Sequence, residues 1–152
     1  MTRDSIRIVH VEDDNDFAEL SARALRQAGF NQPIARCSDG QPAIDYFTRI
    51  NLQSAPHVIL LDLHMPRRNG LEVLRWVRQN YSDRDVAVCL LTSSEDPARK
   101  MQATADGVTA YLIKHALVEI CNKQRLDKTG AKQNTLVNEP AEKLANFSQE
   151  IV

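Results

Sequence analysis

The stretch HVILLDLHMPRRNG, residues 57–70, contains the strongest single indication of how this chain folds. Its four consecutive apolar residues, 58–61, predict a strand that is covered on both faces, as in a parallel sheet. Asp62 ends that run, and because a buried carboxylate without a partner is costly, its position suggests a chemical use. The simpler alternative is that Asp62 only ends the strand and begins the turn into Met65 and Pro66.

On either side of this stretch, strand and helix patterns alternate along the chain. The first helical pattern places five apolar residues on or near one face and stops at Gly29; they are Phe17, Leu20, Ala24, Leu25 and Ala28. The other helices are predicted at 41–50, 70–79, 97–107 and about 116–125, and the strands at 6–11, 33–37, 57–61, 86–91 and 109–113. This alternation predicts an α/β fold, a flavodoxin-like, doubly wound, five-stranded parallel sheet of order 2-1-3-4-5 with helices on both faces.

The composition is that of one ordinary soluble domain, with 152 residues, 43% hydrophobic, 26% charged and a net charge of -1. That net charge gives no reason to expect nucleic acid or anionic lipid as a partner. Charges interrupt the apolar residues at the amino terminus, so we expect neither a signal peptide nor a membrane anchor. Three scattered cysteines and four histidines without metal-ligand spacing favour reduced thiols in the cytoplasm and no histidine-built zinc site.

We expect residues 1–125 to form the domain and residues 126–152 to form a C-terminal tail. The tail is polar at first and has too few residues for a second domain, so we expect no DNA-binding output domain. After Pro140, Leu144, Phe147 and Ile151 recur at helical spacing. This pattern favours a short helix that takes part in a homodimer.

Acidic residues gather at the carboxyl ends of the first and third predicted strands. In a sheet of this order, ligands bind where the strand order reverses, which is between these two strands. Glu12, Asp13 and Asp14 follow the first strand, and Asp62 ends the third. An oxygen-rich cluster of this kind suits a hard cation such as Mg2+. The alternative is that the acids at 12–16 only cap the first helix.

The fourth and fifth predicted strands run into a hydroxyl, Thr92, and a cation, Lys114. Taken singly, these are a turn former and a surface charge. Neighbouring strands are ~4.8 Å apart, so Lys114 must bridge ~10 Å to Asp62, which its long stem can mostly cover. Phosphoryl transfer needs a metal and a cation to neutralise phosphoryl oxygens, and a hydroxyl to orient one of them.

The motifs VHVEDD, LLDLHMPRRNG, LLTSSED and AYLIK together resemble the receiver domain of two-component response regulators, over residues 5 to about 122. The resemblance implies that Asp62 is the phosphoacceptor. It also implies that Asp13, Asp62 and the backbone carbonyl of His64 bind Mg2+, and that Glu12 holds one of the metal's waters.

The same resemblance assigns roles at the fourth and fifth strands. Thr92 binds a phosphoryl oxygen, Lys114 pairs with the phosphorylated carboxylate, and Tyr111 is an aromatic switch residue coupled to Thr92. The chain departs from the family at His115, where proline is usual and follows a cis bond. Because a cis Lys-His bond would cost ~2.5–4 kcal/mol, we expect a trans bond, an altered start to the fifth helix, and Lys114 still reaching Asp62.

The resemblance implies a sensor histidine kinase or a histidine phosphotransfer protein as partner, and it leans towards stand-alone regulators of bacterial phytochrome-type kinases. We expect a phosphoacceptor that catalyses only its own phosphorylation and dephosphorylation and controls protein contacts. A degenerate receiver that serves only for docking is one alternative. A haloacid dehalogenase-type phosphatase is a weaker one, because there the acidic pair comes last and the nucleophile lies in DxD, whereas this chain has DLH.

Overall fold

The computed structural model describes residues 5–127, and in this part of the chain strands and helices alternate strictly. The strands are β1 (Arg7–Val11), β2 (Ala35–Cys37), β3 (His57–Asp62), β4 (Val86–Thr92) and β5 (Ala110–Ile113). The helices are α1 (Asn15–Gln27), α2 (Gly40–Arg49), α3 (Gly70–Asn80), α4 (Pro97–Ala105) and α5 (Lys114–Asp127). The strands form one parallel sheet in the order β2-β1-β3-β4-β5, so the predicted fold is confirmed.

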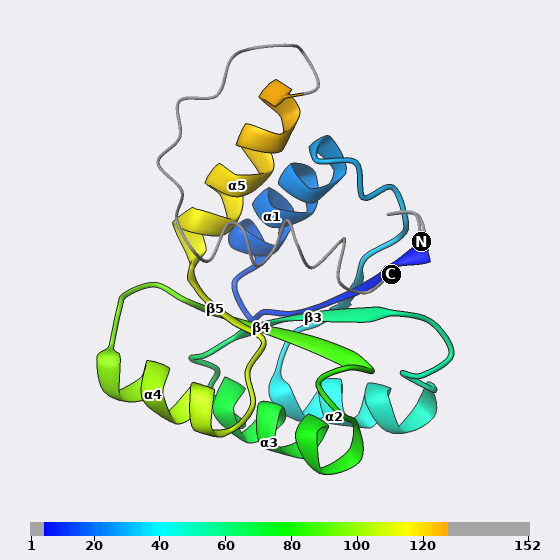
Figure 1. Cartoon of the computed structure of the whole chain (residues 1–152), viewed down its shortest axis with the longest axis vertical. Helices are drawn as coiled ribbons and strands as arrows, with labels where there is room; N and C mark the ends of the chain where they lie inside the picture. The colour runs from blue at the N-terminus through cyan, green and yellow to red at the C-terminus, as the bar shows by residue number, and fades with distance from the viewer. Residues whose placement is uncertain (1–4, 128–152) are drawn as a thin grey trace.

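Helices cover both faces of the sheet (Figure 1). α1 and α5 lie side by side on one face, and α2, α3 and α4 lie on the other. Each face has its own apolar core: Phe47, Leu74 and Val88 belong to the core under α2 and α3, and Leu25 and Leu117 belong to the core under α1 and α5. Because both faces are covered, β3 and β4 are apolar almost throughout, as the sequence predicted.

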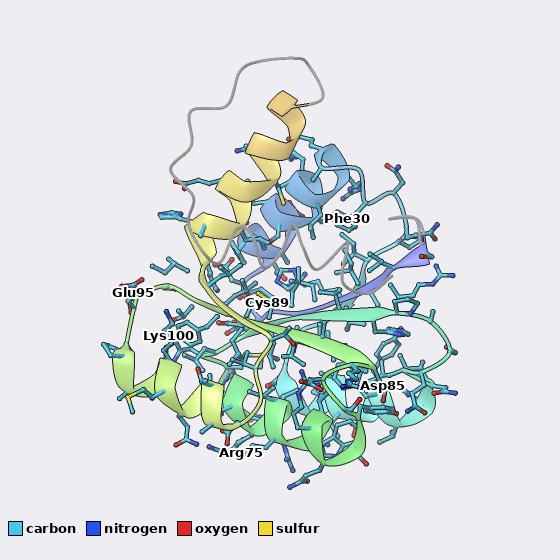
Figure 2. The ribbon with its side chains drawn as sticks, in the orientation of Figure 1. Phe30, Arg75, Asp85, Cys89, Glu95 and Lys100 are labelled. Carbon is cyan, nitrogen blue, oxygen red and sulfur yellow. The ribbon has the colours of Figure 1, made fainter. Side chains whose placement is uncertain are left out.

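The three cysteines are free thiols, and all are buried, as expected from their spacing. Cys89 lies within the sheet (Figure 2). Among the described helices, none is long and apolar enough to cross a membrane.

Side-chain caps set the starts of four helices. Asp14, Asp39, Asn69 and Asp96 each accept hydrogen bonds from backbone N–H groups of the first turn that follows. These bonds satisfy donors that a helix leaves unpaired at its start.

The strand register brings the polar strand ends to one edge of the sheet. Val11 pairs with Leu61, so Glu12 and Asp62 follow at the same level. Thr92 pairs with Ile113, the residue directly before Lys114. The crevice predicted between the first and third strands therefore receives side chains from four neighbouring strands.

Gly70 allows α3 to begin directly against the end of β3. A β-carbon at this position would lie 2.5 Å from the carbonyl oxygen of Asp62 and 2.9 Å from the α-carbon of Leu63. Both are backbone atoms that cannot move aside, so only glycine fits this close approach.

Several details differ from the sequence prediction, among them that β2 begins at Ala35, two residues later than predicted. Leu20 is 47% exposed, so it lies outside the buried face of α1, which Ala18, Ser21, Ala24 and Leu25 form. α5 begins at Lys114, two residues earlier than predicted. The bond from Lys114 to His115 is trans, as expected, like every other peptide bond in residues 5–127. The predicted tail, 126–152, lies almost wholly outside the described residues.

Candidate functional site

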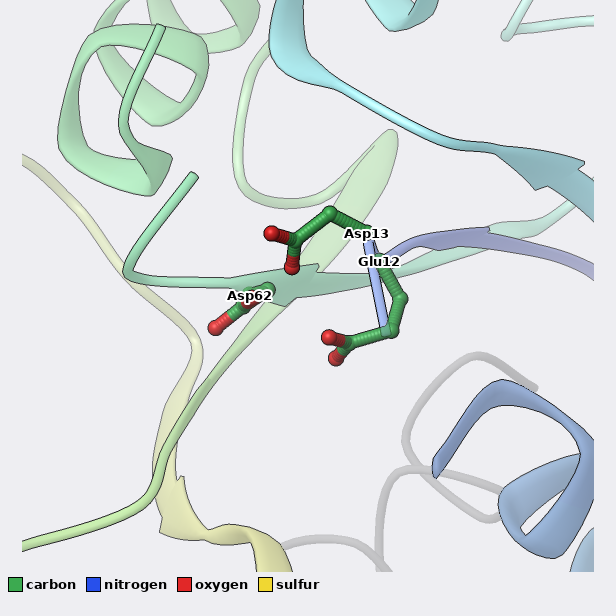
Figure 3. Close-up of side chains that lie close together, drawn as sticks. All are labelled: Glu12, Asp13 and Asp62. Atoms are coloured by element: carbon green, nitrogen blue, oxygen red, sulfur yellow. The ribbon is translucent and has the colours of Figure 1, made fainter. Parts of the chain in front are cut away.

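Three carboxylates meet at the edge where β1 and β3 end (Figure 3). Glu12 and Asp13 follow β1, Asp62 ends β3, and oxygens of the three lie within 4.8 Å of one another. Glu12 is 0% exposed and Asp62 only 3% exposed, whereas Asp13 is open to solvent. Buried acids this close repel unless a cation joins them, and an oxygen-only cluster suits a hard divalent cation.

Lys114 supplies one positive charge to this cluster. Its Nζ lies 2.9 Å from Glu12 Oε1 and 3.7 Å from Asp62 Oδ1, so the predicted reach from β5 to β3 is confirmed. The ammonium also lies 4.7 Å from the centre of the Phe17 ring, which is a cation–π distance. Lys114 therefore pairs more closely with Glu12 than with Asp62 in this structure.

The environment of Asp62 disfavours its charged form. Burial, together with the negative charge of Glu12, raises the pKa of Asp62 to about 8, although Lys114 acts in the opposite direction. The backbone N–H of His64 donates a hydrogen bond to Asp62 Oδ1 at 3.2 Å. Three carboxyl groups share one lysine, so the site has too little positive charge to ionise all three, which is the condition that a bound cation would correct.

Thr92 and Tyr111 lie beside the cluster on β4 and β5. The Thr92 hydroxyl is buried and donates to the carbonyl of Ser94 at 3.0 Å. The Tyr111 hydroxyl is buried without a hydrogen-bond partner among the described residues. Burial raises the pKa of Tyr111, and the nearby Thr92 hydroxyl acts in the opposite direction. The two side chains are neighbours, but no hydrogen bond joins them in this structure.

The acidic residues after β1 have two different roles. Asp14 caps α1 by accepting from the N–H groups of Asp16 and Phe17, as the capping alternative predicted. Glu12 and Asp13 instead face Asp62. The His64 side chain is exposed, and its backbone N–H is what contacts Asp62. The predicted site residues are therefore brought to one edge of the sheet: Glu12, Asp13, Asp62, His64, Thr92, Tyr111 and Lys114.

Sequence reasoning missed two contributors to the site, His10 and Phe17. His10 is 1% exposed, and burial, aided by the charges of Arg36 and Lys114, lowers its pKa to about 4. Its ring packs edge-on against Phe17 at 5.9 Å between centroids. The available signal was the position of His10 two residues before Glu12, which puts both side chains on one face of β1.

An ion pair between Asp39 and Arg67 joins two loops next to the site. Asp39 caps α2, and its carboxylate accepts a hydrogen bond from Arg67 Nε at 2.7 Å. Arg67 belongs to the loop after β3. Its side chain is largely exposed, but the contact joins the loop after β2 to the loop after Asp62.

Comparisons with known proteins agree with this geometry. The family model described as "Response regulator receiver domain" matches residues 8–125. The chain is 36% identical over 114 residues to the "Probable methanogenesis regulatory protein FilR2" of Methanothrix harundinacea, covering 73% of each protein. It is 29% identical over 121 residues to the "Transcriptional regulatory protein CitT" of Halalkalibacterium halodurans, with 80% of this chain and 50% of that protein covered.

Solved structures show the same likeness. A response regulator receiver domain from Rhodospirillum rubrum superposes with a TM-score of 0.70 at 25% identity, covering 83% of this chain and 95% of that one. The Mn(2+)-bound form of response regulator Rcp1 superposes with a TM-score of 0.65 at 25% identity. The match covers 88% of this chain and 99% of that one. The chain spans about half the length of the transcriptional regulators that it matches.

Proposed function

Because this chain belongs to the response regulator receiver domain family, a family of phosphoacceptor signalling modules, we propose that it accepts a phosphoryl group from a histidine kinase on Asp62. The observation that carries this proposal is the buried Asp62 carboxylate, grouped with Glu12 and Asp13 and within 3.7 Å of the Lys114 ammonium. The family match argues against a haloacid dehalogenase-type phosphatase.

Mg2+ is the metal that we propose for the acidic cluster. The donors are all carboxylate oxygens, and burial together with the charge of Glu12 raises the pKa of Asp62 more than Lys114 lowers it. Asp13, Asp62 and the backbone carbonyl of His64 would hold the ion, with Glu12 acting through one of its waters. When bound, the ion neutralises charge that develops on the phosphoryl oxygens. The relative Rcp1, in its Mn(2+)-bound form, supports a divalent cation in this family.

The chemical step needs little from the protein beyond position and charge. An Asp62 oxygen attacks the phosphorus of a phosphohistidine, so an O–P bond forms as the P–N bond breaks, and the imidazole leaves with the electron pair. Lys114 neutralises the transferred group, and the Thr92 hydroxyl donates to one of its oxygens. Both side chains already lie at the strand ends beside Asp62, and such preorganisation lowers the barrier to transfer.

Phosphorylation then switches the conformation at Thr92 and Tyr111. In this structure the Thr92 hydroxyl donates a hydrogen bond to the Ser94 carbonyl, and the Tyr111 hydroxyl has no hydrogen-bond partner among the described residues. A phosphoryl oxygen that draws Thr92 inward leaves space that the Tyr111 ring can enter. The switch exists only if the phosphoryl group favours the second arrangement over the first.

The proposed partners are a sensor histidine kinase or a histidine phosphotransfer protein, with a phytochrome-type kinase as the narrower choice. We place the protein in the cytoplasm, where it acts through protein contacts and not through nucleic acid or a membrane. A homodimer completes this proposal. The docking-only alternative is less well supported, because Asp62 and Lys114 both keep the chemistry that phosphorylation needs.

Labelling with a small phosphodonor tests the proposal. Incubation with radiolabelled acetyl phosphate and Mg2+ should give label that survives acid and is lost in base, as expected of an acyl phosphate. Asp62→Asn should remove the label, and Asp85→Asn, at an exposed aspartate before β4, should keep it. Equal labelling of Asp62→Asn and the parent protein would refute the assignment.

A further inference from the structure

The two oxygens of the Glu12 carboxylate have different surroundings. Oε1 accepts from Lys114 Nζ at 2.9 Å and from the backbone N–H of Asp14 at 3.2 Å. Oε2 is buried and has no hydrogen-bond partner among the described residues. A buried carboxylate oxygen without a donor is unfavourable, so a donor within reach of Oε2 would stabilise the Glu12 carboxylate.

His10 is the group that faces this oxygen. Its Nε2 lies 3.8 Å from Glu12 Oε2, and this nitrogen is likewise buried without a partner in the described part of the chain. His10 and Glu12 alternate with Val11 along β1, so both side chains project to the face that α1 and α5 cover. A small rotation of either side chain would convert this approach into a hydrogen bond.

Phe17 holds the His10 ring in place and links it to Lys114. The edge-on contact between the two rings spans 5.9 Å, and the face of Phe17 lies 4.7 Å from the Lys114 ammonium. The four side chains therefore form a ring of contacts. Glu12 lies between Lys114 and His10, and Phe17 contacts both of these on the other side.

We propose that His10 is a positioning residue that donates its Nε2–H to Glu12 Oε2 and keeps this carboxylate oriented beside the metal site, both while Lys114 is bound to Oε1 and after Lys114 leaves it. This inference rests on the proposed function, in which the phosphoryl group draws the ammonium from Glu12 towards Asp62. Glu12 then keeps only the backbone N–H of Asp14 at Oε1, and the histidine supplies a side-chain donor at Oε2 that holds the carboxylate beside the metal site. His10 touches neither the metal nor the phosphoryl group.

Mg2+ binding without any phosphodonor tests the inference. Calorimetric titration with Mg2+ alone should show that His10→Leu weakens affinity about tenfold, the lower end of what outer-sphere partners contribute. His10→Gln, which keeps a neutral donor, should restore most of that affinity. His57→Gln is the matched control, because His57 is also buried on a central strand but bonds the carbonyls of Leu52 and Ala55. It should bind Mg2+ like the parent protein.

Nitrogen NMR of the imidazole gives a second readout that does not depend on a variant folding. The parent protein should carry the His10 proton on Nε2. A proton on Nδ1, parent-like Mg2+ affinity in His10→Leu, or His10→Gln as weak as His10→Leu would each overturn the inference. These results are separable from those for the proposed function, because metal affinity and tautomer need no phosphoryl transfer, whereas labelling of Asp62 does.

Discussion

At the scale of single residues, the unusual feature is a pair of buried carboxyl groups, Asp62 and Glu12, with one lysine between them. The fold tolerates this arrangement because Lys114 lies within 2.9 Å of Glu12 and 3.7 Å of Asp62. One ammonium cannot neutralise both acids, so burial and Glu12 hold the pKa of Asp62 near 8. The protonated form of Asp62 therefore persists in the metal-free protein up to mildly alkaline pH.

This raised pKa predicts how stability changes with pH. The folded state holds the Asp62 proton more tightly than the unfolded state, so metal-free stability falls as pH rises from about 4 to about 8. Asp62→Asn removes that loss, and we expect it to stabilise the metal-free protein at about pH 8 by on the order of 1–3 kcal/mol, with a smaller gain at about pH 5. Thermal unfolding in a chelator measures the difference between the two proteins.

Addition of Mg2+ is the control for this prediction. The ion should stabilise the parent protein at about pH 8 much more than Asp62→Asn, because it binds the ionised carboxylate. A stability difference between the two proteins that does not change with pH would show that burial does not raise the pKa of Asp62.

At the scale of elements, most of the architecture could be predicted from the sequence, because burial on two faces leaves uninterrupted apolar runs in β3 and β4. The same pattern predicted where the strands end. It therefore also predicted that Asp62, Thr92 and Lys114 lie at strand ends. The roles of His10 and Phe17 could not be predicted, since they depend on how α1 packs over β1. The exposure of Leu20 was missed for the same reason.

The start of α3 is one element boundary on which the site depends. Gly70→Ala would place a β-carbon 2.5 Å from the Asp62 carbonyl, so the backbone of β3 must shift, at a cost of about 1–3 kcal/mol or more. We expect both lower thermal stability and weaker Mg2+ binding. Gly107→Ala, at a positive φ away from the site, should lower stability through strain but leave Mg2+ affinity unchanged. Unchanged Mg2+ affinity in Gly70→Ala would contradict this account of the turn.

The ends of β4 and β5 carry the switch prediction. Thr92→Ala should still take up the phosphoryl mimic beryllofluoride, because Asp62 and the metal ligands remain. The change in the Tyr111 ring resonances that the mimic causes in the parent protein should be largely lost. Thr104→Ala, whose hydroxyl only bonds the Lys100 carbonyl within α4, serves as the control and should respond like the parent. A full Tyr111 response in Thr92→Ala would disprove the coupling.

At the scale of the whole molecule, two large apolar side chains are exposed in the described residues, and they lie on opposite faces of the sheet. Met101 on α4 is 74% exposed, and Leu20 on α1 is 47% exposed. The sequence could not settle which of the two faces meets a partner, because an interface depends on the whole surface. We favour a homodimer that uses the face of the fourth and fifth strand–helix units together with the C-terminal tail.

The dimer prediction compares these two positions. Met101→Glu should weaken self-association about tenfold, because burying a methionine at an interface is worth ~1.5–3 kcal/mol. Leu20→Glu, on the other face, should leave self-association unchanged. Sedimentation with beryllofluoride and Mg2+ measures both variants. A parent protein that stays monomeric at high concentration, with or without the mimic, would rule out the dimer.

The most direct test of the account as a whole is to map the phosphoryl group chemically. After phosphorylation with acetyl phosphate and Mg2+, borohydride reduction converts an aspartyl phosphate to homoserine, which peptide mass spectrometry can locate. We expect the conversion at residue 62 and at no other aspartate, because among the aspartates in residues 5–127 it is Asp62 that combines burial, the acidic cluster and the Lys114 ammonium. Conversion at Asp13 in place of Asp62, or no conversion under conditions that phosphorylate another receiver domain, would contradict the account.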